Sequence, residues 1–347
     1  MAASADAPQL PLALTMGDPS GIGPEIAVHA WRDRARDELP PFAVYADIDL
    51  MRAQCAAFGE VEAVPIATAE MATAIFPRAL PVVDVPLVRA AHAGAPDAQN
   101  GPAVILAIKR AVADIAAGRV MAIVTNPIAK AVLYDAGFSF AGHTEYLGAL
   151  AKEFWPPEPA DPVMMLASSA LRVVPVTIHV PLQSVPSLLT TERIVATTRI
   201  VAAALRRDFA IADPRLVVTG LNPHAGENGA LGHEDRDIIV PAIAALKSEG
   251  LNVAGPYSAD TLFHAAARAT YDAAIAMYHD QALIPIKTLS FDEGVNVTLG
   301  LPFVRTSPDH GTAFGIAGKG IASAASLKAA LKLAAEMSAR RVRAAQR

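Results

Sequence analysis

Apolar residues in this chain form two kinds of pattern that alternate along the sequence. Short apolar runs at residues 11–18, 42–47 and 273–278 are typical of strands buried on both faces of a parallel sheet. Segments 101–118 and 191–209 instead repeat their apolar residues at helical spacing. Strands that alternate with helices in this way predict an α/β fold with a doubly wound, mostly parallel sheet.

Other segments continue this alternation of strands and helices, although their apolar residues repeat less regularly. The sequence predicts further helices at 24–35, 235–248, 260–268 and 326–345, and strands within 119–125, 163–180 and 295–307. Residues 60–98 are rich in Pro and Ala, and we expect only short strands and loops there. The Pro-rich segment 155–162 is expected to be a loop at the edge of a domain, since a chain of 347 residues is long enough for two domains.

Composition narrows the class of protein. Hydrophobic residues make up 53% and aromatic residues 5%, and the formal net charge of -5 offers no basic surplus for binding nucleic acid. Cys55 is the only cysteine, which excludes an intramolecular disulfide and a thiolate zinc site and favours a reducing compartment. The first ten residues lack the pattern of a signal peptide, and no apolar run is long enough to cross a membrane. We therefore expect a soluble, cytoplasmic protein.

Three histidines each follow a predicted strand: His179 in VPVTIHVPL, His224 in LVVTGLNPHAGE and His279 in AIAMYHDQ. Because sites in open parallel sheets lie outside the carboxyl ends of the strands, these residues are candidates for a shared metal site. Three neutral imidazoles without a thiolate favour Zn²⁺, with Mg²⁺ or Co²⁺ as alternatives. The ordinary alternative is that each histidine caps its own loop through a hydrogen bond.

Candidate anion-binding residues lie in two other segments. His143 and Thr144 follow a glycine at the start of a predicted helix, where backbone N–H groups attract anions, although a simple threonine cap explains the pattern equally well. Lys287, Asn296 and Arg305 lie in apolar, strand-like sequence. A cation buried there needs a partner, which a substrate phosphate or carboxylate would provide, whereas a surface position is the alternative for Lys287.

The chain has neither a complete G-x-G-x-x-G motif nor a P-loop. A nicotinamide cofactor would therefore not bind through an ordinary Rossmann turn. The sequence DHGTAFGIAGKG is the alternative cofactor loop, because its glycines would allow close wrapping around an adenosine; these are Gly311, Gly315, Gly318 and Gly320.

Taken together, the motifs resemble a known family. GDPSGIGPE, TNPIAK, GHTEY, LNPHAGE, ADTLF, MYHDQ and GVNVTLGLPFVRTSPDHGTA occur in the order typical of the 4-hydroxythreonine-4-phosphate dehydrogenases of pyridoxal 5′-phosphate biosynthesis. The resemblance runs from about Leu12 to about Lys319. GDPSGIGPE and HGTAFGIAGKG also look like the opening motif and the adenine loop of isocitrate and isopropylmalate dehydrogenases.

The resemblance implies a two-domain isocitrate/isopropylmalate dehydrogenase-like fold with the active cleft between domains. We expect residues 1–135 and 301–347 to form the domain with the cofactor loop, and residues 136–300 to form the domain with the metal ligands and dimer contacts. NAD or NADP would bind near His310, Gly311, Thr312 and Gly318. The protein would be a homodimer whose metal ligands are His179, His224 and His279, the last supplied by the partner subunit.

By the same resemblance the reaction is oxidation of 4-phosphooxy-L-threonine to a 3-oxo acid, which decarboxylates to 3-amino-2-oxopropyl phosphate. Substrate contacts would fall to His143, Thr144, Lys287, Asn296 and Arg305, and Lys287 and Asp260 are candidates for catalysis. Ala282 replaces a glycine that some members carry, so related dehydrogenases of 4-phospho-threonate, 4-phospho-erythronate or an aromatic cis-dihydrodiol are alternatives. A three-histidine metal hydrolase or lyase is the alternative from another class.

Overall fold

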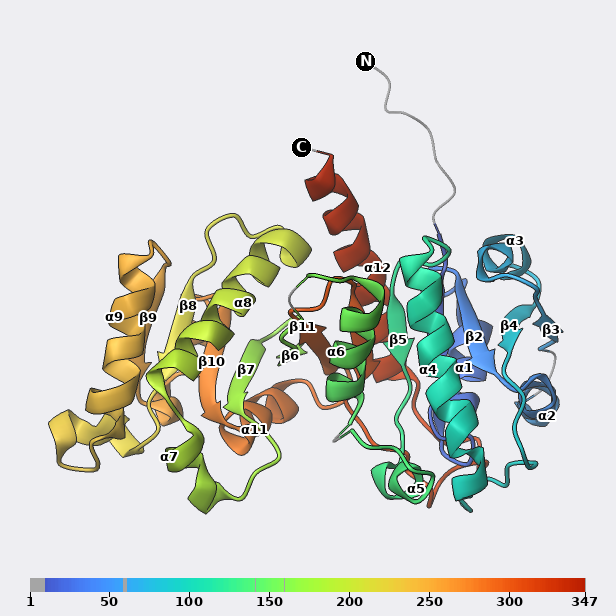
Figure 1. The fold of residues 1–347 in the computed structure, drawn as a ribbon, viewed down its shortest axis with the longest axis horizontal. Coiled ribbons are helices and arrows are strands. Elements are labelled where there is room, and N and C mark those ends of the chain that lie inside the picture. Colours follow the sequence, from blue (N-terminus) through green and yellow to red (C-terminus); the bar gives the residue numbers. More distant parts are fainter. Residues whose placement is uncertain (1–9, 59–60, 141, 159, 347) are drawn as a thin grey trace. The chain divides into compact units, whose positions relative to one another are not determined.

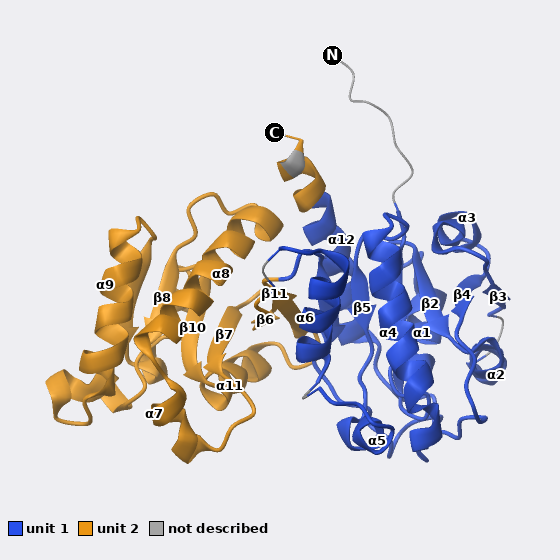
Figure 2. Cartoon of the chain, viewed as in Figure 1, with its two compact units in different colours: residues 1–160, 301–339 blue, residues 161–300, 340–347 orange. Residues whose placement is uncertain are grey.

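A computed structural model describes residues 10–58, 61–140, 142–158 and 160–346. The N-terminal segment on which the signal-peptide prediction rests lies almost wholly outside the described residues. The chain divides into two compact units, coloured separately in Figure 2: unit 1 contains residues 1–160 and 301–339, and unit 2 contains residues 161–300 and 340–347. The first division falls inside the Pro-rich segment 155–162. Residues 136–160, which the sequence analysis places in the second domain, belong to unit 1.

Unit 1 is built on a parallel sheet with strand order β3-β4-β2-β1-β5-β12. The helix α4 lies against β1, β2 and β5, and α12 packs on the other face, where Thr306 Oγ1 donates to the carbonyl of Ala330 (Figure 1). Its strands are β1 (Leu12–Thr15), β2 (Phe42–Ala46), β3 (Ala63–Pro65), β4 (Leu80–Asp84), β5 (Ile123–Thr125) and β12 (Arg305–Pro308). Its helices are α1 (Gly23–Arg32), α2 (Ile48–Phe58), α3 (Ala72–Ile75), α4 (Gly101–Ala116), α5 (Lys130–Asp135) and α6 (His143–Phe154), with α12 (Ala325–Ala345) ending in unit 2.

Unit 2 is built on a mixed sheet with strand order β11-β6-β7-β10-β8-β9, in which β6 runs antiparallel to both neighbours. Alternate residues of β10, such as Ala274 and Ala276, pack with Ile286 of α11 in one apolar cluster. The strands are β6 (Val163–Ala167), β7 (Arg172–Thr177), β8 (Leu216–Thr219), β9 (Val253–Tyr257), β10 (Ala273–Tyr278) and β11 (Val295–Leu299). The helices are α7 (Val185–Leu188), α8 (Thr191–Phe209), α9 (Val240–Ser248), α10 (Ala265–Arg268) and α11 (His279–Leu289).

The expected α/β class is confirmed, and the strongest patterns give the right elements. Thr190 caps α8, since its side chain accepts a hydrogen bond from the backbone N–H of Arg193 at 3.2 Å. Two expectations are wrong. The helix expected at 260–268 is reduced to a short turn and the four residues of α10, and Lys287 lies in α11 rather than in a strand. None of the helices in the described residues is both long enough and apolar enough to cross a membrane.

Candidate functional site

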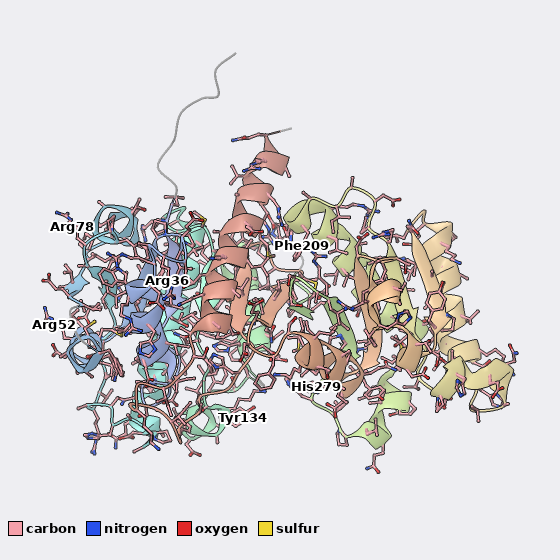
Figure 3. The ribbon with its side chains drawn as sticks, turned by 180° about the vertical axis from the view of Figure 1, so that it is seen from behind. Arg36, Arg52, Arg78, Tyr134, Phe209 and His279 are labelled. Atoms are coloured by element: carbon pink, nitrogen blue, oxygen red, sulfur yellow. The ribbon has the colours of Figure 1, made fainter. Side chains whose placement is uncertain are left out.

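The three candidate metal ligands all lie in unit 2, beyond the carboxyl ends of neighbouring parallel strands. β10 pairs with β7 on one side and with β8 on the other, so the three strands end at the same edge of the sheet. His179 follows β7 and His224 follows β8. His279, which is labelled in Figure 3, is the first residue of α11, directly after β10. The strand-end positions predicted from the sequence are therefore confirmed.

Two of these histidines lie side by side in one chain. The ring centroids of His179 and His279 are 5.6 Å apart with an interplanar angle of 44°. They line a cavity of about 290 Å³ together with Thr177, Val180, Leu182, Val185, Tyr278 and Asp280. Two imidazoles bound to one tetrahedral zinc ion, each at the usual Zn–N distance, would have centroids roughly 5 Å apart. The pair therefore fits two ligands of a common divalent ion.

The surroundings of His279 also suit a metal ligand. Its Nδ1 lies 2.7 Å from Oδ1 of Asp280. In a histidine that binds a metal through one ring nitrogen, the N–H of the other ring nitrogen commonly donates a hydrogen bond to a carboxylate. This hydrogen bond fixes the orientation of the ring. Nε2 of His279 is then the nitrogen that would face an ion.

His224 does not join the pair within one chain. In the part of the chain that the structure describes, no three His, Cys, Asp or Glu side chains are grouped as a metal site. His224 instead lies near Asp260, where a hydrogen bond from Ser258 and, more weakly, His224 lower the pKa of the Asp260 carboxyl. A single chain therefore brings together two of the three predicted ligands.

The loops that contain His179 and His224 both include residues with a strained, left-handed backbone conformation. His179 has a φ of 53°, and His224 to Asn228 form a left-handed turn in which all five φ angles are positive. Left-handed conformations cost L-residues free energy, so they persist where the surrounding structure fixes them. Asp235 provides this support, because its buried carboxylate accepts hydrogen bonds from the backbone N–H groups of Leu221 at 2.9 Å and Asn222 at 3.1 Å.

A second group of candidate residues lies in unit 1 around Arg305, at the start of β12. The side chain is 3% exposed, and Thr125 Oγ1 accepts hydrogen bonds from its Nε at 3.2 Å and its Nη2 at 2.6 Å. Burial lowers the pKa of Arg305 to about 10, which still leaves the guanidinium charged at neutral pH. A charged, buried guanidinium is well suited to bind an anionic substrate group.

His143 begins α6, within electrostatic reach of this guanidinium, and Thr144 follows in the first turn. Burial, and then the charges of Arg305 and Lys130, hold the pKa of His143 well below 6.5. The imidazole is therefore neutral at pH 7, and its buried Nε2 has no hydrogen-bond partner in the described structure. This side chain can donate to or accept from a ligand without carrying charge.

The predicted cofactor loop, which contains His310, Gly311, Thr312 and Gly318, is held against the GDPSGIGPE segment in unit 1. The backbone N–H of Ile22 donates to the carbonyl of Thr312 at 3.0 Å. The buried carboxylate of Glu25 accepts from the N–H groups of Gly318 at 2.8 Å and Ala322 at 3.1 Å. A Cβ on Gly318, whose φ is 74°, would lie 2.7 Å from Cβ of Ala93, so only glycine suits this close approach.

The remaining predicted residues are spread over unit 2. Lys287 lies on α11 with its Nζ 5.7 Å from the centroid of the Phe291 ring, and Asn296 lies on β11 opposite Leu166. Sequence reasoning missed Thr125 and Glu25, although both belong to motifs that carried the family resemblance. The signal that could have found Thr125 is its position at the carboxyl end of β5.

Comparisons with known proteins agree with the fold and with the motifs. The family model described as "Pyridoxal phosphate biosynthetic protein PdxA" matches residues 38–334. A 4-hydroxythreonine-4-phosphate dehydrogenase from Methylorubrum populi is 57% identical over 334 residues, which cover 95% of each chain. The crystal structure of a 4-hydroxythreonine-4-phosphate dehydrogenase from Klebsiella pneumoniae superposes with a TM-score of 0.85 at 37% identity, covering 96% of this chain and 99% of that one.

A more distant solved structure is a terephthalate 1,2-cis-dihydrodiol dehydrogenase from Burkholderia xenovorans. It has a TM-score of 0.62 at 28% identity and covers 95% of this chain and 98% of that one. The family model and the relative from Methylorubrum populi each span most of the chain. The chain therefore belongs to the pyridoxal phosphate biosynthetic protein PdxA family.

Proposed function

We propose that this protein catalyses the NAD- or NADP-dependent oxidation of 4-phosphooxy-L-threonine to a 3-oxo acid, which then decarboxylates to 3-amino-2-oxopropyl phosphate. Support comes from relatives named 4-hydroxythreonine-4-phosphate dehydrogenase, which are 57% and 54% identical over 95% of this chain. The structural observation that carries the proposal is the buried, charged guanidinium of Arg305 within electrostatic reach of the neutral imidazole of His143. This arrangement suits a substrate whose ends are a phosphate and a carboxylate.

The proposal assigns substrate binding to residues of both units. In unit 1, Arg305 would bind an anionic oxygen, while His143 and Thr144 would present ring and hydroxyl groups at the start of α6. In unit 2, Lys287 and Asn296 would hold the other polar groups of the substrate. Fixing both ends of a small substrate supplies much of the rate enhancement of such reactions, because the reacting carbon is then positioned.

The metal would be held by His179, His224 and His279, and zinc is the ion that three imidazoles favour, with Mg²⁺ and Co²⁺ as alternatives. A bound divalent ion would supply Lewis acidity at the substrate hydroxyl and carbonyl, while the nicotinamide would accept the hydride. Asp260 is a carboxylate at neutral pH, since the Ser258 hydroxyl lowers the pKa of this group. Asp260 and Lys287 are the two candidates for accepting or returning the proton of the substrate hydroxyl.

The cofactor would bind at the loop that contains His310, Gly311, Thr312 and Gly318. Support comes from the way Glu25 fixes this loop, because a fixed backbone can offer its N–H and carbonyl groups to an adenosine without a further loss of entropy. The cytoplasm is the proposed compartment, since a chain whose single cysteine is buried and unpaired suits a reducing environment.

A homodimer is part of this proposal. Three large apolar side chains of unit 2 are exposed: Leu182, which lines the His179–His279 cavity, is 68% exposed, and Ile284 in α11 and Phe291 just after it are 65% and 74% exposed. Apolar side chains exposed in one region are typical of a surface that another subunit covers. By the family resemblance, the partner's His279 would complete the ligand set of His179 and His224, in place of the same-chain His279 whose ring lies 5.6 Å from that of His179.

The test is a substrate panel with metal-stripped and zinc-loaded protein. We expect absorbance of NADH or NADPH to rise with 4-phosphooxy-L-threonine, and 3-amino-2-oxopropyl phosphate to form, only after metal is restored. Preference for 4-phospho-threonate, 4-phospho-erythronate or an aromatic cis-dihydrodiol would instead assign one of the related activities. Turnover of a phosphorylated acid without reduction of the nicotinamide would identify a hydrolase or lyase and contradict the proposal.

A further inference from the structure

A second cation of unit 1 lies beside the first turn of α6 and acts on the same histidine, His143, as Arg305 does. Lys130, the first residue of α5, has its Nζ 3.4 Å and its Cε 3.2 Å from the point where a Cβ on Gly142 would lie. Gly142 is the N-cap of α6, which is 12 residues long. The N-terminus of a helix already carries positive partial charge, so a nearby ammonium group is unfavourable there unless an anion lies between them.

Buried polar atoms near the same guanidinium lack partners in the described structure. Thr15 is 1% exposed, and its Oγ1 makes no hydrogen bond. Parallel pairing places Thr15 opposite Thr125, so both side chains lie on the same face of the sheet, where Thr125 Oγ1 accepts from Arg305. Nε2 of His143 is the second such atom. Because buried polar groups of native proteins nearly always have partners, these atoms point to a polar ligand.

The number of positive charges identifies the class of that ligand. Lys130 and Arg305 both act on His143, since each lowers the pKa of the imidazole, after the larger effect of burial. A carboxylate offers one negative charge, whereas a phosphate monoester carries between one and two at neutral pH and offers three acceptor oxygens. The two cations, the N-terminus of α6 and the Thr15 hydroxyl therefore match a phosphate monoester better than a carboxylate.

Glu145 offers the competing explanation for the position of Lys130. Its Oε2 lies 3.5 Å from the same point beside Gly142, so the ammonium group could serve to neutralise this carboxylate. The absence of a Cβ at Gly142 leaves room for the lysine in either case. A test must therefore separate a lysine that binds ligand from a lysine that only balances Glu145.

We propose that Lys130 is a specificity-determining residue, which binds the phosphate monoester of the substrate together with Arg305 and the N-terminus of α6. The inference rests on the proposed function for the identity of the substrate. Binding of phosphate by these residues of unit 1 is a separate property that can be measured without turnover. Lys130 would thus distinguish the phosphorylated substrate from the same hydroxy acid without its phosphate.

The experiment is calorimetric titration of the full-length protein with inorganic phosphate at low ionic strength. Lys130→Ala should weaken phosphate binding about 10- to 100-fold, because a charge-assisted contact is lost, and Lys130→Arg should lose less. Lys109→Ala is the matched control, since this exposed lysine of unit 1 pairs with Glu153 at 2.8 Å. In turnover, Lys130→Ala should raise KM for the phosphorylated substrate and leave KM for the nicotinamide unchanged.

The Glu145→Gln background separates the two explanations. If Lys130 binds phosphate, Lys130→Ala must still weaken binding in that background. If it has no effect there, or if wild-type protein does not bind millimolar phosphate, the inference is overturned. Lys130-dependent phosphate binding without oxidation of 4-phosphooxy-L-threonine would contradict the proposed function alone. Oxidation with wild-type phosphate affinity in Lys130→Ala would contradict this inference alone.

Discussion

Thr125 holds the guanidinium of Arg305 through two hydrogen bonds to one hydroxyl oxygen, across a separation of 180 residues in sequence. The contact arises because β12 and β5 are parallel neighbours, with Arg305 opposite Ile123. A hydroxyl fixes the plane of a guanidinium without neutralising its charge, as a carboxylate would. Thr125 therefore orients Arg305 and preserves its positive charge for an anionic ligand.

We predict that Thr125→Val, which keeps the shape but removes the hydroxyl, raises KM for the phosphorylated substrate about 10-fold. The lost hydrogen bonds to a charged group are each worth about 1.5 kcal/mol or more, and the guanidinium would no longer be fixed. Steady-state kinetics measures the effect, and Thr125→Ser should restore most of the affinity. Thr306→Val is a control for the loss of a buried hydroxyl on the other face of the sheet. An unchanged KM in Thr125→Val would show that Arg305 does not need this contact.

The sequence predicted those elements whose apolar residues repeat regularly. The stripe of α8 and the run of β10 have the period of the element that forms, and both were predicted within a residue or two. The helix α11 was missed because Pro285 interrupts an apolar stretch that looks like a strand. Its helix begins at His279, and packing of Ala282 and Ile286 on the sheet overrides the local signal.

The sequence predicted the candidate residues that come directly after a strand. It did not predict contacts that depend on which strands are neighbours in the sheet. His179 and His279 come after strands that the sequence identifies, and their rings do lie together. The contact between Thr125 and Arg305 depends on the pairing of β5 with β12, which no local pattern reveals. The left-handed turn at His224 was equally invisible, since Asp235 stabilises it from eleven residues away along the chain.

Asp235 is expected to stabilise that turn. Asp235→Ala removes an acceptor for two backbone N–H groups and for the Asn222 side chain, and should lower the free energy of unfolding by about 3 kcal/mol. Hydrogen exchange should accelerate most for the amides of residues 221–229. Asp237→Ala is the matched control, because this exposed carboxylate forms a surface ion pair with the neighbouring Arg236 at 2.7 Å. Unchanged exchange in the turn would contradict the role assigned to Asp235.

The buried carboxylate of Asp208 should make the stability of unit 2 depend on pH. Burial raises the pKa of this group, but hydrogen bonds from Arg207 and Arg341 outweigh that effect and hold it below 3.8. A carboxyl with a lower pKa in the folded state stabilises the protein fully above the unfolded pKa of about 3.9. That contribution is lost as pH falls through the folded pKa.

We therefore predict that Asp208→Asn lowers the free energy of urea unfolding by about 3 kcal/mol at pH 7, because it leaves Arg341 without its buried counter-charge. The difference from wild type should shrink as pH falls below about 4, because the wild-type carboxyl is protonated there in the unfolded state before it is protonated in the folded state. Glu249→Gln, at the exposed pair with Arg199, should have little effect at either pH. A difference that stays constant down to pH 3 would show that the charge of Asp208 is not what stabilises the fold.

The last prediction concerns whether one subunit or two supply the metal ligands. His179 and His279 lie 5.6 Å apart within one chain, yet the proposed dimer takes His279 from the partner. Mixing inactive His179→Ala protein with inactive His279→Ala protein separates these arrangements. If ligands are shared, one site of each heterodimer carries both substitutions and the other site carries neither. After complete exchange, half of the dimers are heterodimers, so activity should return to about a quarter of wild type in a C₂ dimer.

If both histidines of a site come from the same chain, every site carries one substitution. Activity that stays at zero, with subunit exchange verified by native mass spectrometry, would therefore contradict a shared site and assign the His179–His279 pair to a single subunit.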